Sequence, residues 1–167
     1  NLTVNADGSY SIAGFDLDEL PLGNNATGTF TYAVIDDSGA ESNVVTANIT
    51  ISGTNDNPEL IAGAITGTED ELEAGISVAA GASDLLDQAT DVDDVDATLV
   101  ISQVEGNGAN VGQPVAITLS YVDADGVNQT QAVNLTLNAD GSYSIAGFDL
   151  DELPLGNNAT GTFTYAV

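Results

Sequence analysis

Carboxylates and a few tyrosines are the only side chains in this chain that can ionise. The chain holds 26 Asp and Glu residues and no Lys, Arg, His or Cys, so its formal net charge is −26. Salt bridges between side chains are therefore impossible, and each carboxylate must lie in water, accept hydrogen bonds or bind an external cation. Because 43% of the residues are apolar, we expect a folded core rather than a disordered chain. A divalent cation is the simplest partner for this charge.

The run Asn55-Asp56-Asn57-Pro58 is the most informative short motif for such a cation. Calcium takes six to eight oxygen ligands from carboxylates, amide carbonyls and backbone carbonyls. An Asn-Asp-Asn run supplies all three kinds within one tight segment. The alternative interpretation is a solvated turn, because Asn, Asp and Pro are common turn residues.

The negative charge also narrows the classes of function. Nucleic-acid phosphates and anionic membrane surfaces would be repelled, and no segment is apolar enough to suggest insertion into a membrane. Acid–base catalysis would depend on carboxylates and tyrosine alone. We therefore do not expect a nucleic-acid-binding protein or a membrane-inserted segment. We also do not expect an enzyme, for example a glycosidase that uses paired carboxylates, because the duplicated sequence gives no sign of one unique catalytic pair.

An internal repeat organises the chain. Residues 1–34 and 134–167 have the same sequence except that Val4 is replaced by Leu137, which gives a period of 134 − 1 = 133 residues. Self-similarity at a fixed period is typical of tandem arrays. The turn-rich stretch 53–58 is the predicted linker. Residues 1–52 are then the C-terminal part of one repeat and residues 59–167 the N-terminal part of the next, and we expect neighbouring repeats or other copies of the chain to complete each part.

Alternating apolar residues and turn signals predict an all-β fold of immunoglobulin-like β-sandwich type. The Asp125-Gly126 pair predicts a hairpin rather than a calcium loop. Helical periodicity is weak, and the one candidate helix is Ala82–Gln88. Four aromatic residues and their copies are expected in the core: Tyr10, Phe15, Phe30 and Tyr32. Strands are expected at residues 29–34, 45–51, 60–65, 76–79, 98–104, 115–122, 127–137 and 143–145.

Several motifs together resemble a known family. Gly53–Pro58, with the sequence GTNDNP, resembles the linker motif of cadherins and the end of the cadherin-like and VCBS-type repeats of bacterial RTX adhesins. Further matches follow in the family's order along the chain: Thr68-Glu69-Asp70, Asp91-Val92-Asp93 and Leu150-Asp151-Glu152, with Leu17-Asp18-Glu19 as the copy of the last. Phe30–Gly39 is similar to the family's penultimate strand and the acidic loop that follows it.

The resemblance implies calcium ions at the junctions between repeats. The ligands implied at the junction within this chain are Asp18, Glu19, Asn55, Asp56, Asn57, Asp91 and Asp93. Those implied at the following junction are Glu69, Asp151 and Glu152, and Asp36 or Asp37 would serve the preceding one.

The function implied by the resemblance is a calcium-rigidified extender, or spacer, of a large adhesin. It would lie outside the cell on a bacterial surface and project a distal ligand-binding region for adhesion or biofilm formation. The alternative is a β-sandwich module that binds a carbohydrate or another surface ligand. A further possibility is that the acidity is a salt adaptation, in which case stability would follow ionic strength rather than calcium.

Overall fold

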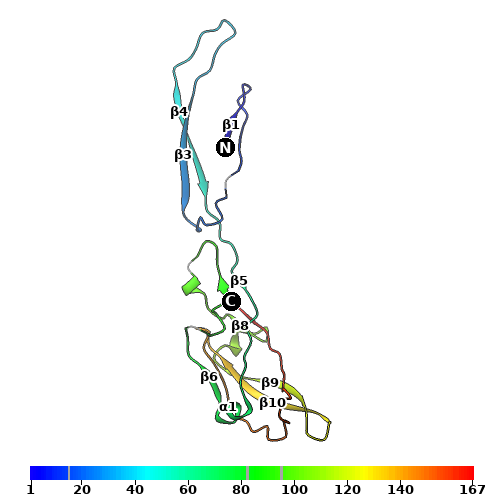
Figure 1. The fold of residues 1–167 in the computed structure, drawn as a ribbon. Helices are drawn as coiled ribbons and strands as arrows, with labels where there is room; N and C mark the ends of the chain where they lie inside the picture. The colour runs from blue at the N-terminus through cyan, green and yellow to red at the C-terminus, as the bar shows by residue number, and fades with distance from the viewer. Residues whose placement is uncertain (15, 82, 95) are drawn as a thin grey trace. The chain divides into compact units, whose positions relative to one another are not determined.

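Short antiparallel sheets dominate the computed structural model, which describes residues 1–14, 16–81, 83–94 and 96–167 (Figure 1). The chain is all-β, as the sequence predicts. Its helical elements are α1 (Glu69–Ala74) and the 3-10 turns η1 (Asp96–Thr98) and η2 (Gly108–Asn110). Its strands are β1 (Leu2–Val4), β2 (Tyr10–Ile12), β3 (Asn25–Tyr32), β4 (Val45–Ser52), β5 (Glu59–Leu60), β6 (Ile76–Val78), β7 (Ala89–Thr90), β8 (Gln103–Val104), β9 (Pro114–Val122), β10 (Asn128–Leu137), β11 (Tyr143–Ile145) and β12 (Tyr165–Ala166).

Contacts divide the chain into two units. The first unit comprises Asn1–Asn57 and Asp91–Val95, and the second comprises Pro58–Thr90 and Asp96–Val167. Among the described residues, the buried apolar side chains all belong to the second unit.

Two separate hairpins make up most of the first unit. Strands β1 and β2 pair with Leu2 opposite Ile12 and Val4 opposite Tyr10. Strands β3 and β4 pair over eight residues, from Asn25 opposite Ser52 to Tyr32 opposite Val45. A two-stranded hairpin is marginally stable in water unless other elements cover one of its faces.

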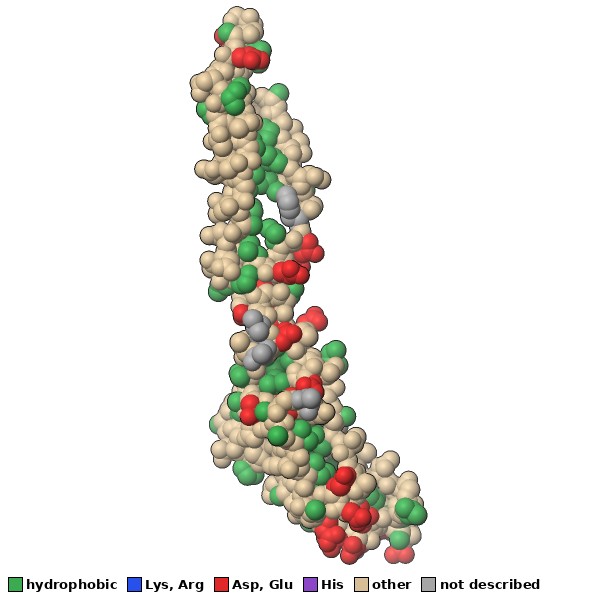
Figure 2. All heavy atoms as spheres, turned by 60° about the vertical axis from the view of Figure 1, so that its left-hand side comes forward, with side chains coloured by type: hydrophobic (Ala, Val, Ile, Leu, Met, Phe, Trp, Pro, Cys, Tyr) green, Lys and Arg blue, Asp and Glu red, His purple; other side chains and the backbone are tan. Residues whose placement is uncertain are grey.

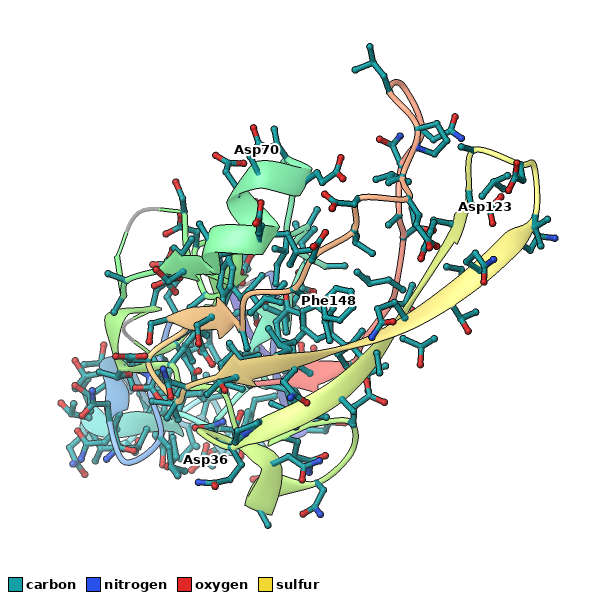
Figure 3. The ribbon with its side chains drawn as sticks, turned by 90° about the horizontal axis from the view of Figure 1, so that it is seen from below. Asp36, Asp70, Asp123 and Phe148 are labelled. Carbon is teal, nitrogen blue, oxygen red and sulfur yellow. The ribbon has the colours of Figure 1, made fainter. Side chains whose placement is uncertain are left out.

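The second unit has a conventional core on a four-stranded sheet in the order β6-β11-β10-β9. Alternation along β10 places Val133, Leu135 and Leu137 on one face, where each is at most 4% exposed. These side chains pack with Leu85, Ile101, Val104, Ile117 and Tyr143. Figure 3 shows Phe148 directed toward this interior.

The turn between β9 and β10 confirms the predicted hairpin. Asp123 Oδ1 accepts hydrogen bonds from the backbone N–H groups of Asp125 (3.0 Å) and Val127 (2.9 Å), and Oδ2 accepts from Gln129 Nε2 (2.8 Å). Gly126 has a φ of +79°, a conformation that glycine adopts without steric cost. Figure 3 labels Asp123 in this turn.

The helix prediction was wrong. The described part of Ala82–Gln88 forms turns, and Ala82 itself lies outside the described residues. The α-helix is α1 instead, and it begins with a capping box in which Thr68 Oγ1 accepts from Glu71 N (3.2 Å) and Thr68 N donates to Glu71 Oε2 (2.8 Å). This cap satisfies N–H groups that a helix of six residues otherwise leaves open.

Two strand predictions were too long and one set of core residues was partly wrong. Only Glu59–Leu60 and Gln103–Val104 are strands within or beside the ranges predicted at 60–65 and 98–104. Tyr10 is 70% exposed and Tyr32 is 45% exposed, although both were expected in the core. Phe15 lies outside the described residues. The remaining predicted strands are confirmed to within a few residues.

Candidate metal centre

Asp93 is the one buried charged side chain among the described residues, with 6% of its surface exposed. Its Oδ2 atom accepts a hydrogen bond from the Asp56 backbone N–H at 3.3 Å. Its Oδ1 atom is buried and has no hydrogen-bond partner. Because a buried carboxylate oxygen without a partner is costly, this atom calls for a proton or a cation.

The segment around Asp93 is held by the neighbouring aspartate. Asp91 Oδ1 accepts hydrogen bonds from the backbone N–H groups of Asp93 (3.1 Å) and Asp94 (3.0 Å). Such a turn around an Asp side chain is a local preference of the sequence Asp-x-Asp. It fixes the backbone at Asp93 and keeps two carboxyl groups close to each other.

The electrostatics of this pair are unfavourable when both carboxyl groups are ionised. Burial raises the pKa of Asp93, and hydrogen bonding to the Asp91 side chain and the negative charges of Asp91 and Asp56 raise it further. Partial burial works against ionisation of Asp91 as well, but hydrogen bonds from Asp93 and Asp94 lower its pKa below the ordinary value. The pair therefore favours one proton or an external positive charge.

Asp18 belongs to the same acidic neighbourhood. The Asp16 carboxylate, some burial and the Asp56 carboxylate raise the pKa of Asp18. The Asp18 backbone N–H points to Asp16 Oδ1 at 3.4 Å. Asp56 therefore interacts with both Asp18 and Asp93, and these residues come from the three segments that the sequence motifs singled out. We call Asp18, Asp56, Asp91 and Asp93 the acidic cluster.

The other residues predicted for this junction are not part of the cluster. Asn55 uses its side-chain Nδ2 to donate to the Asp56 backbone carbonyl. Glu19 and Asn57 are exposed. Asn55 therefore contacts the backbone of Asp56 and not its carboxylate.

The residues predicted for the other junctions have local roles. Glu69 lies in the first turn of α1, where an acidic residue is favoured by the helix dipole. Asp36 Oδ1 accepts from the backbone N–H groups of Ser38 (2.9 Å) and Ala40 (2.8 Å), and the Ser38 hydroxyl and these N–H groups lower the pKa of Asp36. Asp37, Asp151 and Glu152 are exposed.

Sequence reasoning missed Asp16. It stands two residues before Asp18, and this Asp-x-Asp spacing is the same signal that pointed to Asp91 and Asp93. The absence of a turn prediction at residues 16–18 explains why it was overlooked.

Carboxylate oxygens are the ligand type that hard divalent cations prefer, and one carboxylate oxygen of the cluster is buried without a partner. In the described part of the chain, however, no group of three carboxylates lies close enough together to hold a metal ion as folded. Binding an ion here would draw the carboxylates closer.

A scan against protein-family models matched none, and searches of curated proteins and solved structures likewise found no match. In the described parts of the chain, no helix has the length and apolarity to cross a membrane.

Proposed function

We propose that this chain is a calcium-rigidified extender module of a large bacterial surface adhesin, working outside the cell and projecting a distal ligand-binding region. Its architecture is a tandem array of β-sandwich repeats with a period of 133 residues. Its partners are neighbouring repeats. A spacer requires length and stiffness rather than a unique site, and near-identity of residues 1–34 and 134–167 is compatible with that requirement.

The observation that carries the proposal is the buried, unpartnered Oδ1 atom of Asp93 beside two more carboxylates. No side chain of the chain can carry the positive charge that would compensate them. Figure 2 shows one face of the molecule, on which acidic side chains occur and basic side chains do not. The compensating charge must come from a proton or from an ion in solution.

Calcium bound by Asp18, Asp56, Asp91 and Asp93 would supply two positive charges and accept several oxygen ligands at once. The four carboxylates come from separate segments of the chain, at residues 18, 56 and 91–93. One ion would therefore fix the linker 53–58 to its surroundings. In the absence of calcium, repulsion between like charges would loosen the same segments.

Isothermal titration calorimetry with calcium tests the proposal directly. We expect saturable binding to the full chain and at least about tenfold weaker binding to the variant Asp93→Asn, since affinity at such sites follows the number of ligand charges. Asp94→Asn is the matched control, because it removes the same charge from an exposed position in the same segment.

Equal weakening by the two substitutions would mean that calcium responds to net charge rather than to a site. Absence of saturable binding to the unmodified chain would remove the basis of the proposal and would favour the carbohydrate-binding or salt-adaptation alternatives.

A further inference from the structure

Identical sequences have different surroundings in the two units. Tyr143 is 7% exposed and Leu150 is 4% exposed, whereas their equivalents Tyr10 and Leu17 are 70% and 38% exposed. Leu137 is 1% exposed and Val4, the single difference between the copies, is 47% exposed. Because the local sequence is the same, the difference comes from what covers these side chains.

In the second unit the covering elements come from the parts of the block 59–133 that belong to this unit, residues 59–90 and 96–133. Strand β6 pairs with β11, placing Val78 opposite Tyr143. Strand β9 pairs with β10, placing Val115 opposite Leu135. Tyr165 pairs with Val104, a side chain with no exposed surface.

Three pairs of glycines show how closely this block fits. A Cβ built on Gly147 would lie 2.5 Å from the Glu73 carbonyl oxygen, and one on Gly161 would lie 2.6 Å from the Thr118 carbonyl oxygen. A Cβ on Gly141 would lie 2.9 Å from Asp84 Cγ. At the equivalent glycines of the first unit, Gly14, Gly28 and Gly8, a Cβ would meet no atom within 4 Å.

The first unit has two openings. At the equivalent positions of the second unit, residues of the block 59–133 are packed. One, of about 460 Å³, is lined in part by Ile12, Gly14 and Leu17. The equivalent stretch of the second unit packs against α1, where the Phe148 backbone N–H donates to the Leu72 carbonyl at 3.1 Å.

The other opening, of about 480 Å³, is lined in part by Thr27 and Gly28. Their equivalents in the second unit, Thr160 and Gly161, lie against β9, where Thr160 pairs with Ser120. In Figure 2, hydrophobic side chains lie open along the first unit, in the upper part of the view.

We propose that this open face of the first unit is the docking surface for a second copy of residues 59–133. We use the name open face for the first-unit residues whose equivalents contact other elements in the second unit: Val4, Tyr10, Ile12, Gly14, Leu17 and Gly28. The β1–β2 hairpin already has the register of β10–β11, since Leu2 pairs with Ile12 as Leu135 pairs with Ile145. Docking therefore needs no rearrangement of the hairpin itself.

The repeat assigns the register of the docked copy. Val78 of the copy lies opposite Tyr10, Ile76 opposite Ile12, and Val115 opposite Leu2. Helix α1 of the copy fills the opening beside Gly14, and its strand β9 lies against Gly28 as it lies against Gly161 in the second unit. This proposal rests on the tandem repeat in the proposed function but not on calcium.

The test uses the full chain with a second copy of residues 59–133 joined in front of Asn1. The new Val133–Asn1 bond reproduces the natural Val133–Asn134 bond. The measurement is hydrogen exchange detected by mass spectrometry. Peptides that contain Val4 differ in mass from the equivalent peptides that contain Leu137, so the two copies are followed separately. We expect residues 2–12 to exchange at least about tenfold more slowly in the extended chain than in the original one, approaching residues 135–145.

Gly28→Val is the blocking variant. Gly28 has open space around its Cβ position and no positive φ, so a strand-favouring valine is tolerated in the original chain. In the extended chain the valine would collide with strand β9 of the docked copy and should return residues 2–12 to fast exchange. Thr29→Val is the matched control, because Thr29 and its equivalent Thr162 are both exposed, and it should leave the slow exchange intact.

Peptides containing position 137 report in the same sample that the original second unit stays folded. Fast exchange at residues 2–12 in the extended chain would overturn the docking proposal. Slow exchange that survives Gly28→Val would overturn the register. The original and the extended chain are each measured in EDTA and in calcium. Slow exchange in EDTA would support docking even if calcium does not bind, so the two proposals can fail separately.

Discussion

Tyr10 and Tyr143 provide a matched pair of substitutions within one chain. Each lies in the same ten-residue sequence, NADGSYSIAG, at residues 5–14 and 138–147. Effects of Tyr→Ala on the unfolded state are therefore nearly the same at the two positions. A difference between the variants reports on the folded state alone.

The expected difference follows from burial. Tyr10 is 70% exposed and Tyr143 is 7% exposed. A tyrosine buries about 150–250 Å² when fully covered, and about 25 cal/mol is gained per Å² of apolar surface removed from water. Tyr143→Ala should therefore lower the free energy of unfolding by roughly 2–4 kcal/mol more than Tyr10→Ala does.

Urea unfolding followed by circular dichroism measures this difference. With a slope of about 2 kcal/mol per molar urea, we expect Tyr143→Ala to lower the midpoint of the main transition by roughly 1–2 M. Tyr10→Ala should change it by less than about 0.3 M, as expected for an exposed site. Equal losses at the two positions would refute the contrast in burial on which the docking proposal depends.

Three further predictions concern local structure and pH. Thr68→Ala should cost about 1 kcal/mol by removing the cap of α1, whereas the control Thr66→Ala should be neutral in the same urea experiment. Hydrogen bonds from Gln129 and from the backbone lower the pKa of Asp123. The stabilising effect of Asp123 is therefore present above its ordinary pKa and is lost as the pH falls below about 4. Asp123→Asn should make the free energy of unfolding fall less steeply with decreasing pH in this acidic range. The pKa of Asp93 is raised by burial and by the neighbouring carboxylates. Its effect on stability therefore depends on pH in the opposite direction to that of Asp123, and stability is lost as the pH rises through the folded-state pKa of Asp93. In EDTA at pH 7, Asp93→Asn should therefore melt at a higher temperature than the unmodified chain, and the two should converge near pH 4; a lower melting temperature for the variant at pH 7 would contradict this account.

Local sequence signals were sufficient where the structure is local. The Asp125-Gly126 turn and the alternation in the flanking strands correctly predicted the β9–β10 hairpin. The strand at Tyr143–Ile145 was also predicted with the observed bounds. Helix α1 was missed because Thr68-Glu69-Asp70 was interpreted as a ligand motif, although Thr68 followed by Glu71 is a capping-box signal.

Burial depends on partners that no local pattern contains. The sequence around Tyr10 is the same as that around Tyr143, and yet one tyrosine is exposed and the other is in the core. Alternation predicts which face of a strand is apolar, but it does not say whether another element covers that face. The expectation that Tyr10 and Tyr32 are core residues failed for this reason.

The acidic cluster was predicted in part. Its four residues were all among the predicted ligands, because each belongs to a short acidic motif that can be read from the sequence. The burial of Asp93 could not be read in this way, since it depends on segments brought together by folding. Asp16 could have been found from its Asp-x-Asp spacing to Asp18, but that signal was overlooked. Whether these residues bind calcium stays a prediction.

Thermal unfolding under three ionic conditions tests the central claim of calcium binding most directly. The unmodified chain is melted in EDTA, in millimolar calcium and in sodium chloride of matched ionic strength. A ligand at about 100 times its dissociation constant adds about 2.7 kcal/mol to the free energy of unfolding, which raises the midpoint by roughly 5–10 °C in a chain of this size. We expect calcium to raise the midpoint by this amount beyond sodium chloride. Equal midpoints in calcium and in matched sodium chloride would contradict a specific calcium site.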